Sequence, residues 1–204
     1  MQRVIAYVDG FNLYNGLKDK HGYRYLWLDL EQLVQRLLRP GQGLDEVVYF
    51  TARVRNRLGS ERRQSIYLDA LAATCPKVSI VEGRFQLKRL RCRACGATRP
   101  SYEEKETDVS IAAALVEHAA LNRYDTALLI SADSDLCPAV RAVKRLRPAA
   151  RVVAAFPPRR RSDDLRAVVD ASFTIGDANL RRSQLPERVR SRIGVDLHRP
   201  AKWR

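Results

Sequence analysis

Residues 4–16 read VIAYVDGFNLYNG, and this stretch decides the architecture expected of the chain. Val4–Val8 form a continuous apolar run, which is typical of a strand buried on both faces of a parallel sheet. The run ends on Asp9 and Gly10, residue types that are ordinary in turns. Alternatively, Asp9 is a ligand-binding carboxylate, because open α/β sheets bind ligands at the carboxyl ends of their strands. The deciding feature is whether other carboxylates reach the same edge.

Apolar runs of this kind recur along the chain, and helical patterns separate them. We expect strands at 4–8, 47–51, 78–81, 127–131, 152–156 and 172–175. Helical spacing of apolar residues predicts helices at 28–38, 62–74, 109–121 and 136–146. Strands that alternate with helices indicate βαβ units, so the expected fold class is α/β, with a mainly parallel central sheet and helices on both faces.

Composition narrows the class of protein. The 204 residues are 46% hydrophobic, which allows a sizeable core and suggests one domain with an appendage. No apolar stretch approaches the about 20 residues of a membrane helix, and no signal-peptide pattern opens the chain, so we expect a cytoplasmic protein without a membrane partner. The 37 Lys and Arg against 23 Asp and Glu give a net charge of +14, which favours a polyanionic partner, nucleic acid before anionic membrane.

A second apolar run also leads to carboxylates. In TALLISADSDLCPAV, residues 126–140, Asp133 and Asp135 follow the predicted strand. Ser134 or Asp135 would serve as a cap for the next helix, which is the structural explanation for either residue. A cap explains one oxygen-bearing side chain, but it does not explain two aspartates at the carboxyl edge of another strand.

A third carboxylate comes from EEKETDVSIAAALVEH, residues 103–118. Asp108 immediately precedes the first apolar residue of the predicted helix, where the helix dipole alone would favour it. If that helix begins at the carboxyl edge of the sheet, Asp108 faces Asp9 and Asp133. Carboxylates this close together need a cation, and an oxygen-only acidic cluster suits Mg²⁺ or Mn²⁺.

Together, YVDGFN, KETDV and LLISADSDLCPAV resemble the NYN-domain family, the PIN-like nucleases that include bacterial LabA-like proteins. The resemblance spans residues 3–175, with the three blocks in order. It implies a three-layer α/β/α PIN-like fold and a metal-dependent endoribonuclease, with Mg²⁺ or Mn²⁺ as cofactor and RNA, single-stranded by preference, as partner. The family often has Gly where Ala132 stands. Carried onto this chain, the resemblance implies as catalytic residues Asp9, Asn12, Asp108, Asp133 and Asp135, of which the four aspartates are the metal ligands.

Two other functions are alternatives to a metal-dependent endoribonuclease. A non-catalytic RNA-binding regulatory module that retains the acidic pocket is the main alternative, and the complete set of four aspartates favours the enzyme. A haloacid-dehalogenase-type phosphatase also starts with an aspartate at a strand end. That mechanism needs a second aspartate two residues later, where this chain has Phe11.

Three arginine-rich stretches directly follow predicted strands, at 53–63, 84–93 and 159–161. Loops that follow parallel strands emerge at one edge, so these stretches predict a phosphate-backbone track that leads to the acidic residues, with a solvated charged surface as the alternative. Stacking on unpaired bases is a candidate role for three tyrosines, with packing as the plainer role: Tyr14, Tyr23 and Tyr102. The expected nucleic-acid-binding residues are Arg53, Arg55, Arg57, Lys105, Arg159, Arg160 and Arg161.

Cys92 and Cys95 have the C-x-x-C spacing of half a zinc ribbon, in a loop expected at about 84–102. A structural zinc site needs four ligands, and no second matched pair is present. Zinc, a site shared between the subunits of a homodimer, a redox pair and free thiols therefore remain open.

The alternation of strands and helices stops after residue 175. We expect a nuclease-like domain over residues 1–176 and a basic C-terminal tail over residues 177–204. Residues 181–204 contain eight Lys or Arg and two acids. Two interpretations stay open: an arm that orders only on its partner, or a segment docked on its own domain through Leu197 and Trp203.

Overall fold

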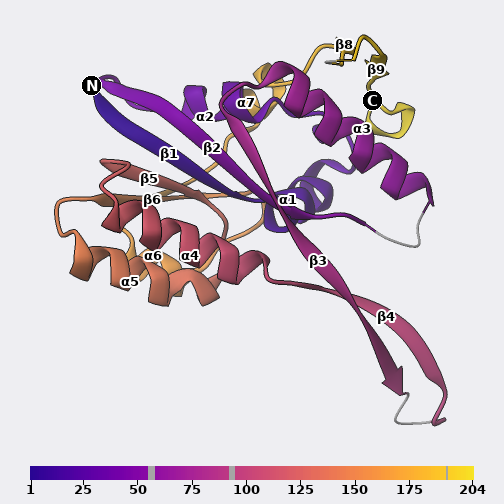
Figure 1. Cartoon of the computed structure of the whole chain (residues 1–204), viewed down its shortest axis with the longest axis horizontal. Helices are drawn as coiled ribbons and strands as arrows, with labels where there is room; N and C mark the ends of the chain where they lie inside the picture. The colour runs from indigo at the N-terminus through magenta and orange to yellow at the C-terminus, as the bar shows by residue number, and fades with distance from the viewer. Residues whose placement is uncertain (55–57, 92–94, 192) are drawn as a thin grey trace.

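The structure is a computed structural model that describes residues 1–54, 58–91, 95–191 and 193–204. For residues 84–91 and 99–105 it describes the backbone alone. Seven strands form one sheet in the order β4-β3-β2-β1-β5-β6-β7 (Figure 1). Within it, β3, β2, β1, β5, β6 and β7 are parallel, and β4 is antiparallel to β3. The strands are β1 Gln2–Asp9, β2 Gln42–Ala52, β3 Val78–Arg91, β4 Thr98–Lys105, β5 Thr126–Ile130, β6 Arg151–Phe156 and β7 Ala171–Thr174.

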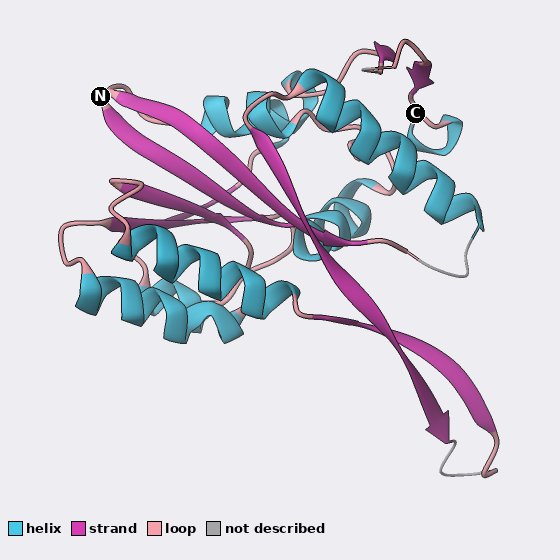
Figure 2. Cartoon of the chain, viewed as in Figure 1, coloured by secondary structure: helices cyan, strands magenta, loops and turns pink. Residues whose placement is uncertain are grey.

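Helices cover both faces of this sheet (Figure 2). They are α1 Gly10–His21, α2 Leu30–Leu37, α3 Leu58–Thr74, α4 Thr107–Ala120, α5 Cys137–Leu146, α6 Asp163–Val168 and α7 Asp177–Arg182. Short elements complete the chain: the 3-10 turns η1 Ser134–Leu136 and η2 Ala201–Trp203, and the antiparallel pair β8 Arg188–Arg190 and β9 Asp196–His198. No helix among the described residues is long and apolar enough to cross a membrane.

The alternation of side chains along the strands builds two separate cores. In β1, Val4 and Val8 pack in one core with residues of α1, α2 and α3, whereas Ile5 and Tyr7 pack in the other with residues of α4, α5 and α6. Successive side chains of a strand point to opposite faces, so a strand that is apolar throughout must be covered on both sides. The expected α/β/α layers and mainly parallel sheet are confirmed.

Helix α1 was not among the predicted helices. Its sequence, GFNLYNGLKDKH, contains two glycines and two asparagines, which have low helix propensity. Leu13 and Leu17 nevertheless bury themselves in the core on the β1 face. Tertiary packing of one face therefore outweighs the weak local preference.

The segment after residue 83 is not the loop that the sequence suggested. Val78–Gly83 pair with β2, and β3 then continues through Arg84–Arg91, which pair with β4 in an antiparallel hairpin. Figure 1 shows this hairpin projecting away from the rest of the molecule. The expectation of a loop at 84–102 is wrong because β4 supplies a backbone partner to β3 beyond the end of β2.

The C-terminal segment docks on its own domain. Leu197 and Trp203 are buried in the same core as α3. The Trp203 ring centroid lies 5.8 Å from that of Tyr67 and 6.4 Å from that of Trp27. Of the two interpretations of the tail, the docked one holds, while a domain boundary at residue 176 stays a prediction.

Candidate acidic site at the carboxyl edge of the sheet

Asp9 ends β1 and caps α1. Its Oδ1 accepts the backbone N–H of Asn12 at 2.9 Å, and its Oδ2 accepts the hydroxyl of Ser131 at 2.8 Å. The residue is only 4% exposed. Burial raises the pKa of the Asp9 carboxyl, and the hydrogen bonds from Asn12 and Ser131 oppose this. Asp9 is thus a helix cap and, at the same time, a buried carboxylate at the end of a parallel strand.

Gly10 is required by the close approach of β2 to the start of α1. A Cβ atom on Gly10 would lie 2.6 Å from the carbonyl oxygen of Phe50 and 2.9 Å from the ring of Tyr49. Real Cβ atoms do not come so near a backbone oxygen, so a side chain here would displace the helix that Asp9 caps. The glycine after the aspartate therefore sets where the carboxylate lies.

Ser131 joins the turn after β5 to β1. The side chain is fully buried, and its Oγ both donates to Asp9 and accepts the backbone N–H of Asp133 at 3.1 Å. A parallel link runs from Asn12, whose Oδ1 accepts the N–H of Ala132 at 3.1 Å. The apolar pattern predicts Ser131 only as the end of a strand, with no role in the site. The available signal was a hydroxyl at the end of an otherwise apolar run.

Asp133 and Asp135 occupy the turn that follows. Asp133 caps η1, because its Oδ1 accepts the N–H of Asp135 at 2.9 Å. Its side chain is partly buried, and that of Asp135 is exposed. The expected cap, Ser134 or Asp135, is therefore wrong: Asp133 caps η1, and α5 begins after Leu136 without a side-chain cap.

Asp108 reaches the same edge through the β3–β4 hairpin. The backbone of Lys105 pairs with Arg84, one residue beyond the pairing of Gly83 with Ala52 at the end of β2. Helix α4 consequently begins at the carboxyl edge of the sheet, with Asp108 in its first turn. Burial, followed by the negative charges of Asp133, Asp9 and Asp135, raises the pKa of Asp108 to about 6. The four aspartates share one electrostatic neighbourhood, and their catalytic roles stay predictions.

The donor set fits a hard divalent cation in its chemistry, since it consists of carboxylate and amide oxygens. Beside it, the hydroxyl of Thr107 is buried without a hydrogen-bond partner among the described residues. Within the described part of the chain, however, no three Asp, Glu, His or Cys side chains lie close enough together to form a closed metal site. What the structure shows is that the charges of the other three aspartates act on Asp108 and that the charge of Asp133 acts on Asp9.

The zinc prediction rests on residues that the structure describes only in part. Cys92 lies outside the described residues, and Cys95 is an exposed free thiol. Cys137 is buried at the start of α5, as packing alone would require. Zinc or redox chemistry at the C-x-x-C pair stays a prediction.

The expected phosphate-binding arginines are engaged by protein groups. Arg53 pairs with Glu82 at 2.8 Å, and Arg161 pairs with Asp163 at 2.8 Å. Asp19 holds two more, because its carbonyl oxygen accepts from Arg159 at 2.9 Å and its carboxylate pairs with Arg160. These exposed pairs are worth little energy in water, so they do not prevent contact with a phosphate. Arg55 and Arg57 lie outside the described residues, as does the side chain of Lys105, and nucleic-acid binding by the set stays a prediction.

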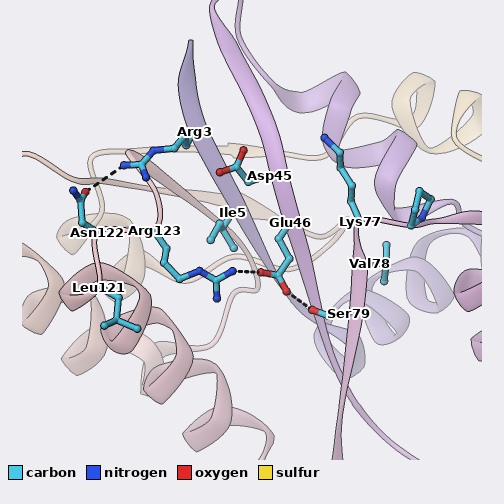
Figure 3. Close-up of a pocket in the computed structure, with 11 residues that line it drawn as sticks. Arg3, Ile5, Asp45, Glu46, Lys77, Val78, Ser79, Leu121, Asn122 and Arg123 are labelled. Atoms are coloured by element: carbon cyan, nitrogen blue, oxygen red, sulfur yellow. Dashed lines mark hydrogen bonds and ion pairs between the residues drawn. The ribbon is translucent and has the colours of Figure 1, made fainter.

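A separate hollow of about 610 Å³ lies at the opposite, amino edge of the sheet (Figure 3). One ion pair lies within it: Arg123 pairs with Glu46 at 3.0 Å, and Glu46 also accepts the hydroxyl of Ser79 at 2.6 Å. It contains none of the predicted site residues. The carboxyl edge is therefore the candidate site.

Parallel strands between two helix layers, with acidic residues at the carboxyl edge, define an α/β protein with a candidate acidic site. The NYN domain model matches residues 3–180, and the chain belongs to this family, which groups with the PIN-like nucleases.

Two comparisons are more distant. The chain is 22% identical over 175 residues to 6-hydroxy-3-succinoylpyridine 3-monooxygenase HspA of Pseudomonas putida, an alignment that covers 70% of this chain. It covers 55% of HspA, so the chain spans about half of that relative. A crystal structure of a protein of unknown function from Vibrio parahaemolyticus has a TM-score of 0.56 at 17% identity and covers 86% of this chain and 94% of that one. This likeness shows the fold.

Proposed function

We propose that this protein is a metal-dependent endoribonuclease that cleaves phosphodiester bonds of RNA at the carboxyl edge of its sheet. The observation that carries the proposal is the environment of Asp108, where burial first, and then the negative charges of Asp133, Asp9 and Asp135, raise its pKa to about 6. A divalent cation bound among these carboxylates would favour the ionised form of Asp108 and remove the repulsion between the like charges. Membership of the NYN family and a net charge of +14 support nucleic acid as the substrate.

In this proposal the four aspartates hold Mg²⁺ or Mn²⁺, which would activate a water molecule and stabilise the leaving oxygen. Ser131 and Asn12 position the ligands, because one binds the carboxylate of Asp9 and the other binds the backbone beside Asp133. RNA as the nucleic acid rests on the family resemblance. The activity in the name of HspA is not transferred, because 22% identity over about half of that protein supports the fold only.

The test is incubation of the purified protein with labelled RNA and DNA of one sequence, with Mn²⁺, Mg²⁺ or EDTA. We expect cleavage of the RNA that needs the cation and is lost in Asp108→Asn. The matched control is Asp45→Asn, which removes an exposed carboxylate at the opposite edge and should leave cleavage unchanged. Cleavage that survives EDTA would overturn the metal mechanism. Binding without cleavage in either metal would instead support the non-catalytic RNA-binding module.

A further inference from the structure

Helix α1 carries aromatic and basic residues beside its buried face, and one of them, Tyr14, packs partly against the core. Leu13, Gly16 and Leu17 are buried against the sheet and its loops. Phe11, Tyr14 and Lys18 are spaced i, i+3 and i+7, so they form one stripe along the side of the helix that adjoins the buried face. Lys18 is exposed, and Phe11 and Tyr14 are partly exposed.

Two residues outside α1 extend this stripe. The Lys18 ammonium lies 5.9 Å from the ring centroid of Tyr14 and 5.9 Å from that of Tyr23. The Lys202 ammonium lies 4.6 Å from the Tyr23 ring. Together these five residues form one continuous surface of rings and cations, here called the α1 stripe: Phe11, Tyr14, Lys18, Tyr23 and Lys202.

Tertiary contacts hold the far end of the α1 stripe in place. Lys202 precedes Trp203, which is buried in the core. Arg199 fastens the same turn, because its guanidinium donates to the carbonyl oxygens of Trp203 and Arg24. The docked C-terminal segment thus places the Lys202 ammonium beside Tyr23, next to α1.

The loop after β6 brings further positive charge to the other flank of α1. A Cβ atom on Gly16 would lie 2.7 Å from the carbonyl oxygen of Pro158, so the glycine lets this loop lie against the helix. Arg160 then pairs with Asp19 of α1. Basic groups consequently lie on α1 from two directions, the α1 stripe on one side of the helix and this loop on another.

The α1 stripe starts at the acidic site. Phe11 is two residues after Asp9, and Tyr14 is five residues after it, which at about 1.5 Å rise per residue is about 7.5 Å along the helix axis from Asp9. If the reacting phosphate of a nucleic-acid strand lies beside Asp9, the neighbouring nucleotides that run along α1 meet Tyr14 and, beyond the end of the helix, Tyr23. Their unpaired bases would find rings to stack on, and their phosphates would find Lys18 and Lys202.

We propose that the α1 stripe is a base-stacking surface that guides single-stranded nucleic acid into the acidic site. Rings interleaved with cations in a positively charged surface are the chemistry that binds unpaired strands irrespective of sequence. A duplex keeps its bases stacked on each other and offers the rings only its backbone. The inference rests on the proposed function only in placing the reacting phosphate of the nucleic acid at the acidic site. Binding to the α1 stripe does not depend on cleavage.

The experiment measures the dissociation constant of a fluorescent single-stranded RNA in EDTA, where a metal-dependent reaction is silent. Two variants of one helix are compared: Lys18→Ala removes a cation on the α1 stripe, and Lys20→Ala removes one that pairs with Asp177 at 2.8 Å instead. We expect Lys18→Ala to weaken binding about fivefold and Lys20→Ala to change it less than about twofold. Tyr23→Leu should weaken it about tenfold and Tyr23→Phe hardly at all, because a ring is what stacks. Thermal melts establish that each variant is folded.

Equal losses in Lys18→Ala and Lys20→Ala, or equal losses for single-stranded and duplex RNA, would overturn the inference in favour of general charge attraction. Unchanged binding in Tyr23→Leu would also overturn it. The proposed nuclease is tested separately: selective loss of binding in a protein that cleaves no RNA supports the α1 stripe and contradicts the enzyme. If the wild type cleaves RNA and the α1-stripe variants bind it normally, the result supports the enzyme and contradicts the α1 stripe.

Discussion

Ser131 and Asp9, which are 122 residues apart in the chain, form a buried hydrogen bond of 2.8 Å at the edge of the sheet. The same hydroxyl accepts the N–H of Asp133, so one side chain fixes the spacing between two of the carboxylates. A buried carboxylate oxygen without such a donor would lose solvation that nothing replaces. The candidate site therefore depends on a residue that carries no charge itself.

Replacing Ser131 by Ala should destabilise the protein by about 1–3 kcal/mol, because Asp9 Oδ2 is left buried without a donor. It should also weaken metal-dependent stabilisation, since the turn that carries Asp133 loses its contact with β1. Urea unfolding measures the first effect, and melts with and without Mn²⁺ measure the second. Ser134→Ala is the control, because this serine is exposed in the neighbouring turn. Equal stability of the two variants would show that the hydroxyl bond contributes nothing.

Asp108 should make the metal-free protein less stable as the pH rises. Its pKa is raised from 3.8 to about 6 in the folded chain, so between these values the folded state holds a proton that the unfolded state has released. Stability therefore falls as the pH rises from about 4 to 6. Asp108→Asn should be more stable than the wild type by about 1 kcal/mol at pH 7 in EDTA and no more stable at pH 4. The same advantage at both values would refute the assigned pKa.

Asp133 allows capping to be separated from charge. Asp133→Asn keeps an oxygen for the N–H of Asp135 but removes one negative charge, whereas Asp133→Ala removes both. We expect the alanine variant to lose about 0.5–2 kcal/mol of stability and the asparagine variant to lose none. Both should lose cleavage and most of the stabilisation by Mn²⁺, which thermal melts report. An asparagine variant that still responds fully to Mn²⁺ means that Asp133 serves the architecture alone.

At the amino edge, Asp125 should stabilise the protein above about pH 4 and cease to do so in acid. Hydrogen bonds from the Arg3 side chain and backbone lower the pKa of Asp125 from 3.8 to about 2. The group is therefore still ionised in the folded state when its unfolded counterpart takes up a proton, and its contribution disappears as the pH falls from about 4 to 2. Asp125→Asn should lower the urea midpoint at pH 6 and flatten its change below pH 4. A mutant whose midpoint falls as steeply as that of the wild type would contradict this.

The C-terminal segment should contribute to stability through its buried side chains. Leu197 is 9% exposed and packs in the core, whereas Ile193 of the same segment is 87% exposed. Leu197→Ala should therefore cost about 2 kcal/mol, and Ile193→Ala should stay within about 0.5 kcal/mol of the wild type. Urea unfolding compares them directly. Equal effects would mean that the segment is not held on the domain in solution.

The sequence by itself determined the layers of the fold and the edge at which the acids gather. Continuous apolar runs can be satisfied only by strands covered on both faces, and parallel strands bring their carboxyl ends to one edge. The position of Asp9 and Asp133 directly after such runs therefore located them before any contact was known. Asp108 was expected at the same edge on the condition that its helix begins there, so that the next parallel strand can run from the opposite edge.

Only the tertiary structure decided which residues meet at that edge and what flanks it. The bond between Ser131 and Asp9, the pairing of Arg160 with Asp19, and the delivery of Lys202 to Tyr23 join segments more than 100 residues apart. Hydrophobic periodicity is a local signal and carries no information about such partners. The β3–β4 hairpin depends in the same way on a partner strand. Helix α1 depends on burial of one face in the core, which outweighs the low helix propensity of its glycines. Neither could be predicted from local sequence patterns.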